Sequence, residues 1–313
     1  MKIALIVIAC VVGVMIIFLF PAIFCSFYMA FYNRKKRSEE EELNYSSMYD
    51  DFKESLDEWV NMAKTIPHTE LEIKSFDNLT LRGRYYEYKK GAITEILFHG
   101  YRGTGLRDMS GGIDRCFKMG RNAIVVDQRA CGRSDGSVIT FGVKERKDCV
   151  KWAEKAVELL GEDCKIILTG ISMGAATVML ASELNLPKNV IGIIADCGYS
   201  CTKDMVYNYM GRIGVNPKIL YPFVKFSARV LGKFKLEERS PIDALKNSTV
   251  PVFIIHGDAD GIVPYYMSKD TFNACASEKQ FVTIEGAGHG LCYPIAPERY
   301  VNELKEFEKI MLK

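Results

Sequence analysis

The chain has 313 residues, of which 48% are hydrophobic and 26% charged, and its formal net charge is +2. This length and composition exclude a disordered chain and allow one large α/β domain or two small ones. The nearly balanced charge provides no basic surface for phosphates, so we expect no nucleic-acid partner. The ten cysteines lack the spacing of a disulfide framework or a C-x-x-C metal site, which favours free thiols in a reducing compartment.

The first segment, residues 3–32, contains no charged residue and is rich in Ile, Val, Phe and Leu. It exceeds the ~20 residues that span a bilayer and the apolar region of a signal peptide, so it predicts a single-pass transmembrane anchor over residues 1–33. A basic cluster at 34–37 follows directly, whereas Lys2 stands alone before the span. The positive-inside rule then predicts a membrane protein whose remaining chain lies on the cytoplasmic side.

Residues 34–66 connect this segment to the rest of the chain. An acidic stretch at 38–42 reads as a solvated linker, and apolar residues at nearly helical spacing over 45–63 predict an amphipathic helix. Its Asp and Glu content favours packing on the domain over lying on a membrane.

Residues 67–313 are predicted to form one α/β domain. Two strands at 71–76 and 79–88, separated by a turn at Asp77 and Asn78, open it as an antiparallel pair. Buried-type strands then alternate with helical segments, which predicts a parallel sheet covered by helices. These strands are expected at residues 93–98, 122–126, 165–169, 190–195, 252–255 and 281–284.

One insertion interrupts this alternation. Residues 199–246 are rich in Tyr, Phe, Met, Val and Leu, which is too apolar for a solvated loop. Prolines and a glycine divide the segment, so we expect a small cap of short helices over the domain.

A G-x-S-x-G pattern lies between the strand at 165–169 and an apolar helical segment. Gly170 and Gly174 flank Ser172, which is typical of a nucleophile elbow, a sharp strand-to-helix turn that exposes a reactive serine. An ordinary strand-to-helix turn is the alternative.

A serine nucleophile requires an imidazole that accepts its proton and an acid that orients the imidazole. His289 lies in a glycine-flanked loop after the last predicted strand and is the expected general base. Asp260 is the preferred acid because it lies further into its loop than Asp258, and Asp196 is a third option. All follow strand ends, where ligands bind in open α/β sheets.

Ester or amide cleavage also needs backbone amides that stabilise an oxyanion. We expect one from Met173, directly after the nucleophile, and a second from Tyr101 in the glycine-rich loop 99–105. A plain glycine-rich loop is the alternative for the second donor. The loop lacks the Gly-Lys-Ser/Thr ending of a phosphate-binding loop.

Five segments together resemble the α/β-hydrolase superfamily, and within it the Bem46-like membrane-anchored serine hydrolases and their bacterial relatives. They are His99-Gly100-Tyr101, Asp127 to Ser134, Gly170 to Gly174, His256 to Pro264 and Gly288-His289-Gly290. The resemblance runs from residue 71 to the C-terminus. It implies an eight-stranded sheet, a Ser172, Asp260, His289 triad and an oxyanion hole from Tyr101 and Met173. One departure is Ala130, where the family usually has glycine.

These features predict a serine hydrolase that cleaves carboxylic esters, with a lipophilic acyl group favoured by the apolar cap and the predicted anchor. The expected substrate is a small-molecule or lipid-like ester, and the chemistry needs no metal or organic cofactor. A serine peptidase of the prolyl-aminopeptidase or oligopeptidase kind is the alternative enzyme. A catalytically silent membrane-bound scaffold is the alternative from another class.

Overall fold

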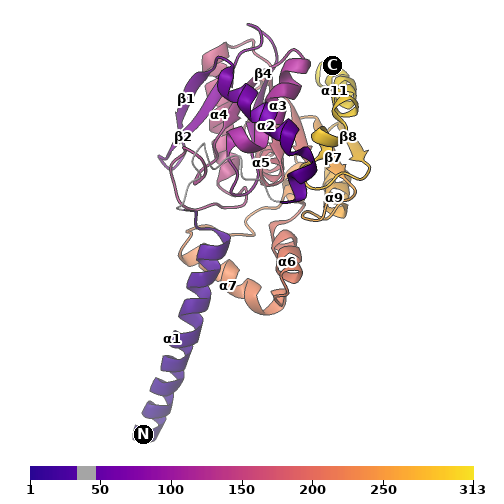
Figure 1. The fold of residues 1–313 in the computed structure, drawn as a ribbon. Helices are drawn as coiled ribbons and strands as arrows, with labels where there is room; N and C mark the ends of the chain where they lie inside the picture. The colour runs from indigo at the N-terminus through magenta and orange to yellow at the C-terminus, as the bar shows by residue number, and fades with distance from the viewer. Residues whose placement is uncertain (34–46) are drawn as a thin grey trace.

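A mixed sheet flanked by helices makes up the body of the protein, and the N-terminal helix projects away from it (Figure 1). The computed structural model describes residues 1–33 and 47–313, without the side chains at positions 9–12, 14, 16 and 18. The predicted basic cluster at 34–37 and the acidic linker at 38–42 therefore lie outside the described residues.

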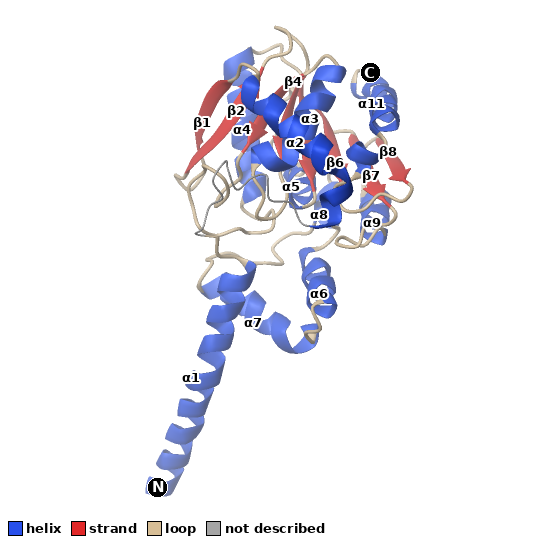
Figure 2. Cartoon of the chain, viewed as in Figure 1, coloured by secondary structure: helices blue, strands red, loops and turns tan. Residues whose placement is uncertain are grey.

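The sheet has eight strands in the order β1-β2-β4-β3-β5-β6-β7-β8, in agreement with the predicted fold. Figure 2 shows strands of the sheet among the helices of the body. β2 pairs antiparallel with β1 and β4, and all later neighbours are parallel. The inner parallel strands are buried nearly throughout, as their apolar sequences require, whereas the edge strand β8 is only partly buried. The strands are β1 (Thr69–Lys74), β2 (Thr80–Tyr86), β3 (Thr94–Phe98), β4 (Asn122–Val126), β5 (Ile166–Ile171), β6 (Val190–Asp196), β7 (Val252–Gly257) and β8 (Lys279–Ile284).

Helices cover both faces of the sheet. One core cluster joins the strands to α4 (Glu145–Leu160), α5 (Met173–Ala181), α8 (Pro241–Leu245) and α9 (Tyr266–Ala274). Two other clusters involve α2 (Lys53–Thr65), α3 (Gly105–Lys118), α10 (Cys292–Ile295) and α11 (Pro297–Met311). The expected amphipathic helix occurs as the short 3-10 helix η2 (Ser47–Phe52) followed by α2, which packs on α3.

A buried ion cluster fastens β3 to α3. Glu95 is fully buried and accepts hydrogen bonds from Arg115 at 2.6 Å and Arg121 at 2.6 Å. The hydroxyl of Thr169 on β5 donates to the same carboxylate at 2.8 Å. Burial raises the pKa of Glu95, but the two guanidinium groups outweigh it and lower the pKa to about 2. Three elements therefore depend on one ionised carboxylate.

Three helices occupy the interval between β6 and β7, where the sequence predicts a cap. They are α6 (Thr202–Arg212), α7 (Pro217–Val230) and α8. Pro217 begins α7, and the side chain of Asn216 accepts a hydrogen bond from the amide of Lys218, which fixes the start of that helix. Figure 1 shows α6 and α7 on the side of the body where α1 meets it.

The predicted transmembrane anchor is wrong. The N-terminal run forms α1 (Lys2–Ala30), but no helix among the described residues is long and apolar enough to cross a membrane. The end of the apolar run belongs to the protein interior, because Phe27 and Phe31 are buried in a cluster with Val206 of α6 and Val224 of α7. The predictions of a single-pass membrane protein, a membrane contact through this helix and a cytoplasmic domain depended on the anchor and are withdrawn with it.

Candidate active site

The G-x-S-x-G pattern forms a tight turn between β5 and α5. Ser172 has φ 56° and ψ −116°, a backbone conformation that L-residues rarely adopt. A Cβ atom on Gly170 would lie 2.2 Å from the carbonyl carbon of Gly174, and a Cβ on Gly174 would lie 2.0 Å from the carbonyl oxygen of Phe98. Both glycines are therefore required by close backbone approach, and together they expose the serine at the carboxyl end of the parallel strands.

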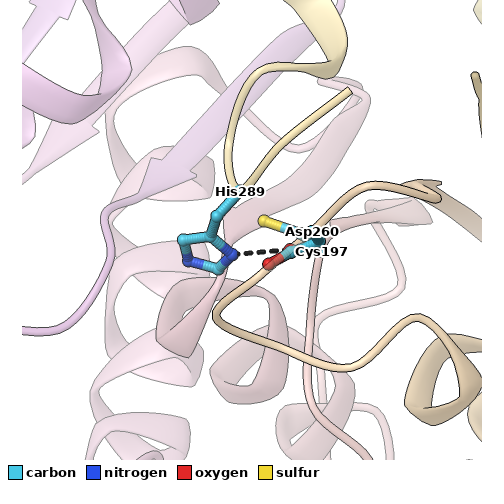
Figure 3. Close-up of side chains that lie close together, drawn as sticks. All are labelled: Cys197, Asp260 and His289. Carbon is cyan, nitrogen blue, oxygen red and sulfur yellow. Dashed lines mark hydrogen bonds and ion pairs between the residues drawn. The ribbon is translucent and has the colours of Figure 1, made fainter. Parts of the chain in front are cut away.

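His289 joins the serine to a carboxylate. Its Nε2 atom lies 2.9 Å from Oγ of Ser172, and its Nδ1 atom lies 2.7 Å from Oδ2 of Asp260. The second contact is the dashed line in Figure 3. The structure thus brings together the three residues predicted as nucleophile, base and acid, from the ends of β5, β7 and β8.

Asp260 is held in place from several directions. Its Oδ1 atom accepts the amides of Ile262 at 2.7 Å and Val263 at 2.9 Å, and the side chain is fully buried. Burial raises the pKa of Asp260, but hydrogen bonds from His256, His289 and the amide of Ile262 outweigh it, so the pKa lies well below its usual range. The carboxylate therefore stays ionised and directed at His289.

The two other candidate acids have different surroundings. Oδ1 of Asp258 accepts the amide of Gly286 at 2.7 Å in an exposed turn. Asp196 is buried and accepts the hydroxyl of Tyr300 at 3.1 Å, while its backbone carbonyl accepts the amide of Ser172 at 2.8 Å. Burial raises the pKa of Asp196. Within the described residues neither carboxylate hydrogen-bonds to His289, which favours Asp260 as its partner.

A second histidine, which the sequence analysis did not assign, contacts Asp260. His256 is fully buried at the end of β7, and its Nε2 atom lies 3.0 Å from Oδ2 of Asp260. Its Nδ1 atom lies 2.6 Å from Oγ of Ser268 on α9. The available signal was a histidine that ends an otherwise apolar buried strand four residues before the predicted acid.

The two predicted oxyanion donors lie beside the serine. In the described part of the chain, neither the amide of Met173 nor that of Tyr101 donates to a backbone carbonyl. A Cβ on Gly100 would lie 3.6 Å from Cβ of Ser172, so the loop that carries Tyr101 passes directly next to the nucleophile.

The peptide group between Gly100 and Tyr101 is fixed by its carbonyl end. That carbonyl lies 2.7 Å from Nδ1 of His99 and accepts the amide of Gly103 at 3.2 Å. Nε2 of His99 accepts the amide of Gln128 at 2.9 Å, which assigns the ring proton to Nδ1. Because the C=O and N–H of a trans peptide point in opposite directions, these bonds turn the Tyr101 amide away from His99.

Cys197 adds a thiol to this cluster (Figure 3). Its sulfur and the ligand atoms of Asp260 and His289 lie within 4.8 Å of one another, which is close enough for a metal ion to bridge them. However, Nδ1 of His289 and Oδ2 of Asp260 share a hydrogen bond, and burial raises the pKa of the Cys197 thiol well above its usual range. A metal ligand needs the deprotonated thiol, so the arrangement favours proton transfer over metal binding.

The comparisons with known proteins add a curated relative of unassigned activity. The uncharacterized protein YqkD of Bacillus subtilis is 24% identical over 190 residues, which are 60% of this chain. The match spans 62% of YqkD, less than two thirds of its length.

Solved structures share the fold. The Pyrococcus furiosus esterase Pf2001 matches with a TM-score of 0.63 at 24% identity, over 79% of this chain and 92% of its own. Est1E of Butyrivibrio proteoclasticus, solved with ferulic acid, matches with a TM-score of 0.60 at 21% identity, over 77% and 99%. The acylaminoacyl peptidase of Pyrococcus horikoshii matches with a TM-score of 0.56 at 19% identity, over 80% and 42%. At these identities the likeness establishes the α/β-hydrolase fold.

A family model gives the narrower assignment. The model of the prolyl oligopeptidase family matches residues 140–313, more than half of the chain, and this segment contains Ser172, Asp260 and His289. The predictions of the α/β-hydrolase superfamily and of a serine hydrolase are confirmed, whereas these matches do not show the narrower Bem46-like likeness. The chain belongs to the prolyl oligopeptidase family.

Proposed function

We propose that the protein hydrolyses carboxylic esters of small, lipophilic acyl groups, with Ser172 as nucleophile, His289 as general base and acid, and Asp260 as the acid that orients His289. The observation that carries this proposal is the single imidazole between a strained serine at 2.9 Å and a buried carboxylate at 2.7 Å. Each contact is within hydrogen-bonding distance, as proton transfer requires.

In the acylation step, Oγ of Ser172 attacks the carbonyl carbon of the ester while Nε2 of His289 takes the hydroxyl proton. The tetrahedral intermediate collapses, the bond to the alcohol breaks, and His289 returns the proton to the leaving alcohol. A water molecule, deprotonated by His289, then attacks the acyl carbon, the bond to Oγ of Ser172 breaks, and His289 returns the proton to Oγ as the carboxylic acid is released. Asp260 stabilises the imidazolium form of His289 in both steps.

The amides of Met173 and Tyr101 are proposed to stabilise the negative oxygen of each intermediate. Met173 follows the nucleophile in the chain, and the loop of Tyr101 passes next to it. Among the described residues neither amide donates to a backbone carbonyl, which leaves both N–H groups available to the substrate. The N-terminal end of α5 adds its positive dipole at the same point, because Met173 is the first residue of that helix.

An apolar surrounding favours esters of lipophilic acids. A hydrophobic cluster includes Met173 and Val263, and its partly buried members are all apolar or aromatic: Tyr101, Phe141, Met205 and Ile262. Two matched structures, Pf2001 and Est1E, are described as an esterase and as a ferulic acid complex.

A serine peptidase remains the second candidate function. The family model is named for prolyl oligopeptidases, and one matched structure is an acylaminoacyl peptidase. The triad chemistry is the same for amides, so the two functions differ only in what the site binds and in how well the leaving group departs.

Two measurements test the proposal. A fluorophosphonate probe should label the wild-type protein and the control Ser55→Ala, which changes an exposed serine on α2, but not Ser172→Ala. Hydrolysis of p-nitrophenyl esters from acetate to laurate should exceed that of matched p-nitroanilides. Equal labelling of Ser172→Ala would refute the nucleophile, and turnover of anilides alone would replace the esterase with the peptidase.

A further inference from the structure

The C-terminal end of α1 contacts the loop that carries the proposed oxyanion donor Tyr101. The side-chain hydroxyl of Tyr101 donates to the carbonyl of Ala30 at 2.8 Å. The side chain of Asn33, just after the helix, donates to the carbonyl of Ala130 at 2.8 Å, and the amide of Ile139 donates to the carbonyl of Phe31 at 2.9 Å. The N-terminal segment is thus attached to the catalytic body at the edge of the active site.

Arg102 makes the most extensive of these contacts. A helix ends with carbonyls that have no partner within the helix, and α1 has no basic residue of its own in its last turn. The guanidinium of Arg102 supplies the missing donor from 70 residues further along the chain. Its Nη2 atom lies 3.3 Å from the carbonyl oxygen of Tyr28, 3.0 Å from that of Met29 and 3.0 Å from that of Tyr32.

Two further features stiffen the connection. Arg102 has φ 53°, in the left-handed region, so its backbone depends on the surrounding contacts to persist. The ring of Tyr101 stacks on Phe141 with a centroid distance of 5.1 Å and an interplanar angle of 22°. Phe141 in turn meets Phe31, next after α1, edge to face at 5.8 Å. Hydrogen bonds to the end of α1 therefore hold both Tyr101 and Arg102, and the stacked ring of Phe141 holds Tyr101 further.

We propose that Arg102 is a positioning residue for the oxyanion hole: by binding the carboxyl end of α1, it fixes the backbone of the loop so that the Tyr101 amide faces the intermediate. This inference rests on the proposed function. Arg102 is adjacent to Tyr101, so any rotation of its backbone changes the direction of the neighbouring peptide groups. His99 contacts the carbonyl of the peptide between Gly100 and Tyr101, and the guanidinium of Arg102 ties the next residue of the loop to the end of α1.

The contact of Arg102 with α1 depends on one atom. Within the described residues, Nη2 makes all the hydrogen bonds from this side chain to the end of α1, and Nε is buried without a hydrogen-bond partner. Arg102→Gly is the informative variant, because glycine adopts φ 53° without strain and only the side chain is lost. Lys233→Gly is the matched control, since Lys233 is an exposed basic residue at φ 54°.

The experiment uses the full chain with p-nitrophenyl butyrate as substrate and butyl trifluoromethyl ketone as the inhibitor whose adduct carries an oxyanion. Loss of a whole oxyanion donor lowers kcat about 100-fold to 1,000-fold, so a misdirected donor in Arg102→Gly should lower kcat about tenfold with little change in KM. Inhibitor affinity should fall by a similar factor. Arg102→Lys should recover part of both, and Lys233→Gly should match the wild type.

Tyr101→Phe tests the same contact by a milder change, because it removes only the hydroxyl that binds Ala30. It should lower kcat about threefold, less than the loss of a whole donor. The inference would be overturned if Arg102→Gly and Tyr101→Phe had the same kcat and inhibitor affinity as the wild type, even if their melting temperatures were lower. If the wild type neither hydrolysed the ester nor reacted with the fluorophosphonate probe, the proposed function itself would be refuted.

Discussion

Nε2 of His256 lies 3.0 Å from Oδ2 of Asp260, the same oxygen that Nδ1 of His289 approaches to 2.7 Å. Two imidazoles thus share one carboxylate oxygen. The ring of His289 lies toward the nucleophile, and the ring of His256 lies toward the interior. Because the inner ring also contacts Ser268 at 2.6 Å, it cannot rotate freely and keeps Asp260 directed at His289. His256 is therefore expected to act through the acid and not on the substrate.

Paired substitutions of His256 separate the two ring nitrogens. The amide nitrogen of glutamine can occupy the place of Nε2 and keep the bond to Asp260, whereas that of asparagine reaches only the place of Nδ1. We expect His256→Asn to lower kcat about tenfold, the value of one hydrogen bond of ~1.4 kcal/mol, and His256→Gln to lose less. Steady-state kinetics would contradict this role if both variants lowered kcat equally, or if only KM changed.

The identity of the acid is tested by two neighbouring aspartates. Asp260→Asn should lower kcat about 10⁴-fold, because an amide can hold His289 in the wrong tautomer. Asp258→Asn should stay within about twofold, since that carboxylate accepts the amide of Gly286 in an exposed turn. If Asp258→Asn lowered kcat more than Asp260→Asn, Asp258 would be the acid that orients His289.

The pH dependence of activity should follow the imidazole. Hydrogen bonds lower the pKa of Asp260 despite its burial, so this carboxylate is already ionised in the range where a histidine titrates. A loss of kcat/KM at falling pH should therefore come from protonation of the group that accepts the serine proton, and not from Asp260. A profile of kcat/KM between pH 4 and 8 that stayed flat would contradict this assignment.

Local patterns predicted the sheet well because each buried strand is a short apolar run with a defined end. The strand predicted at 165–169 is β5 (Ile166–Ile171), and the strand predicted at 122–126 is β4 (Asn122–Val126). The order of Ser172, Asp260 and His289 was also readable, since each follows a predicted strand. These features depend on neighbouring residues, which a sequence displays directly.

Features that depend on distant contacts were not readable. An apolar run does not reveal whether its side chains meet lipid or protein, and the burial of Phe27 and Phe31 against the helices after β6 appears only in the fold. The role of His256 likewise depends on how a loop turns back on its own strand. Arg102 reads as a surface cation, and its partner lies 70 residues earlier in the chain.

The buried carboxylate of Glu95 should control acid stability. Its pKa in the folded protein is lowered to about 2, against ~4.3 in an unfolded chain, so its stabilisation is fully present above pH ~4.3 and is lost as the pH falls toward 2. Glu95→Gln should reduce the free energy of unfolding by about 3–5 kcal/mol at pH 7, because the buried guanidinium of Arg115 loses its counter-charge and that of Arg121 keeps only Glu308. Urea unfolding measures both effects.

The control for Glu95 is Glu72→Gln, which changes an exposed pair with Arg82 at 2.9 Å and should alter stability by less than about 1 kcal/mol. A similar loss in both variants would mean that general charge balance, and not the buried cluster, governs stability.

The elbow glycines give the sharpest steric test. In Gly170→Ala the new methyl would lie 2.2 Å from the carbonyl of Gly174, where neither backbone can yield without moving the serine. We expect this variant to lose fluorophosphonate labelling and to melt at a lower temperature. Gly211→Ala on α6 is the control, since no atom lies within 4 Å of its Cβ and alanine favours a helix by up to ~1 kcal/mol. If Gly170→Ala were labelled as fast as the control, the turn would tolerate a side chain, and close backbone approach would not explain the exposed serine.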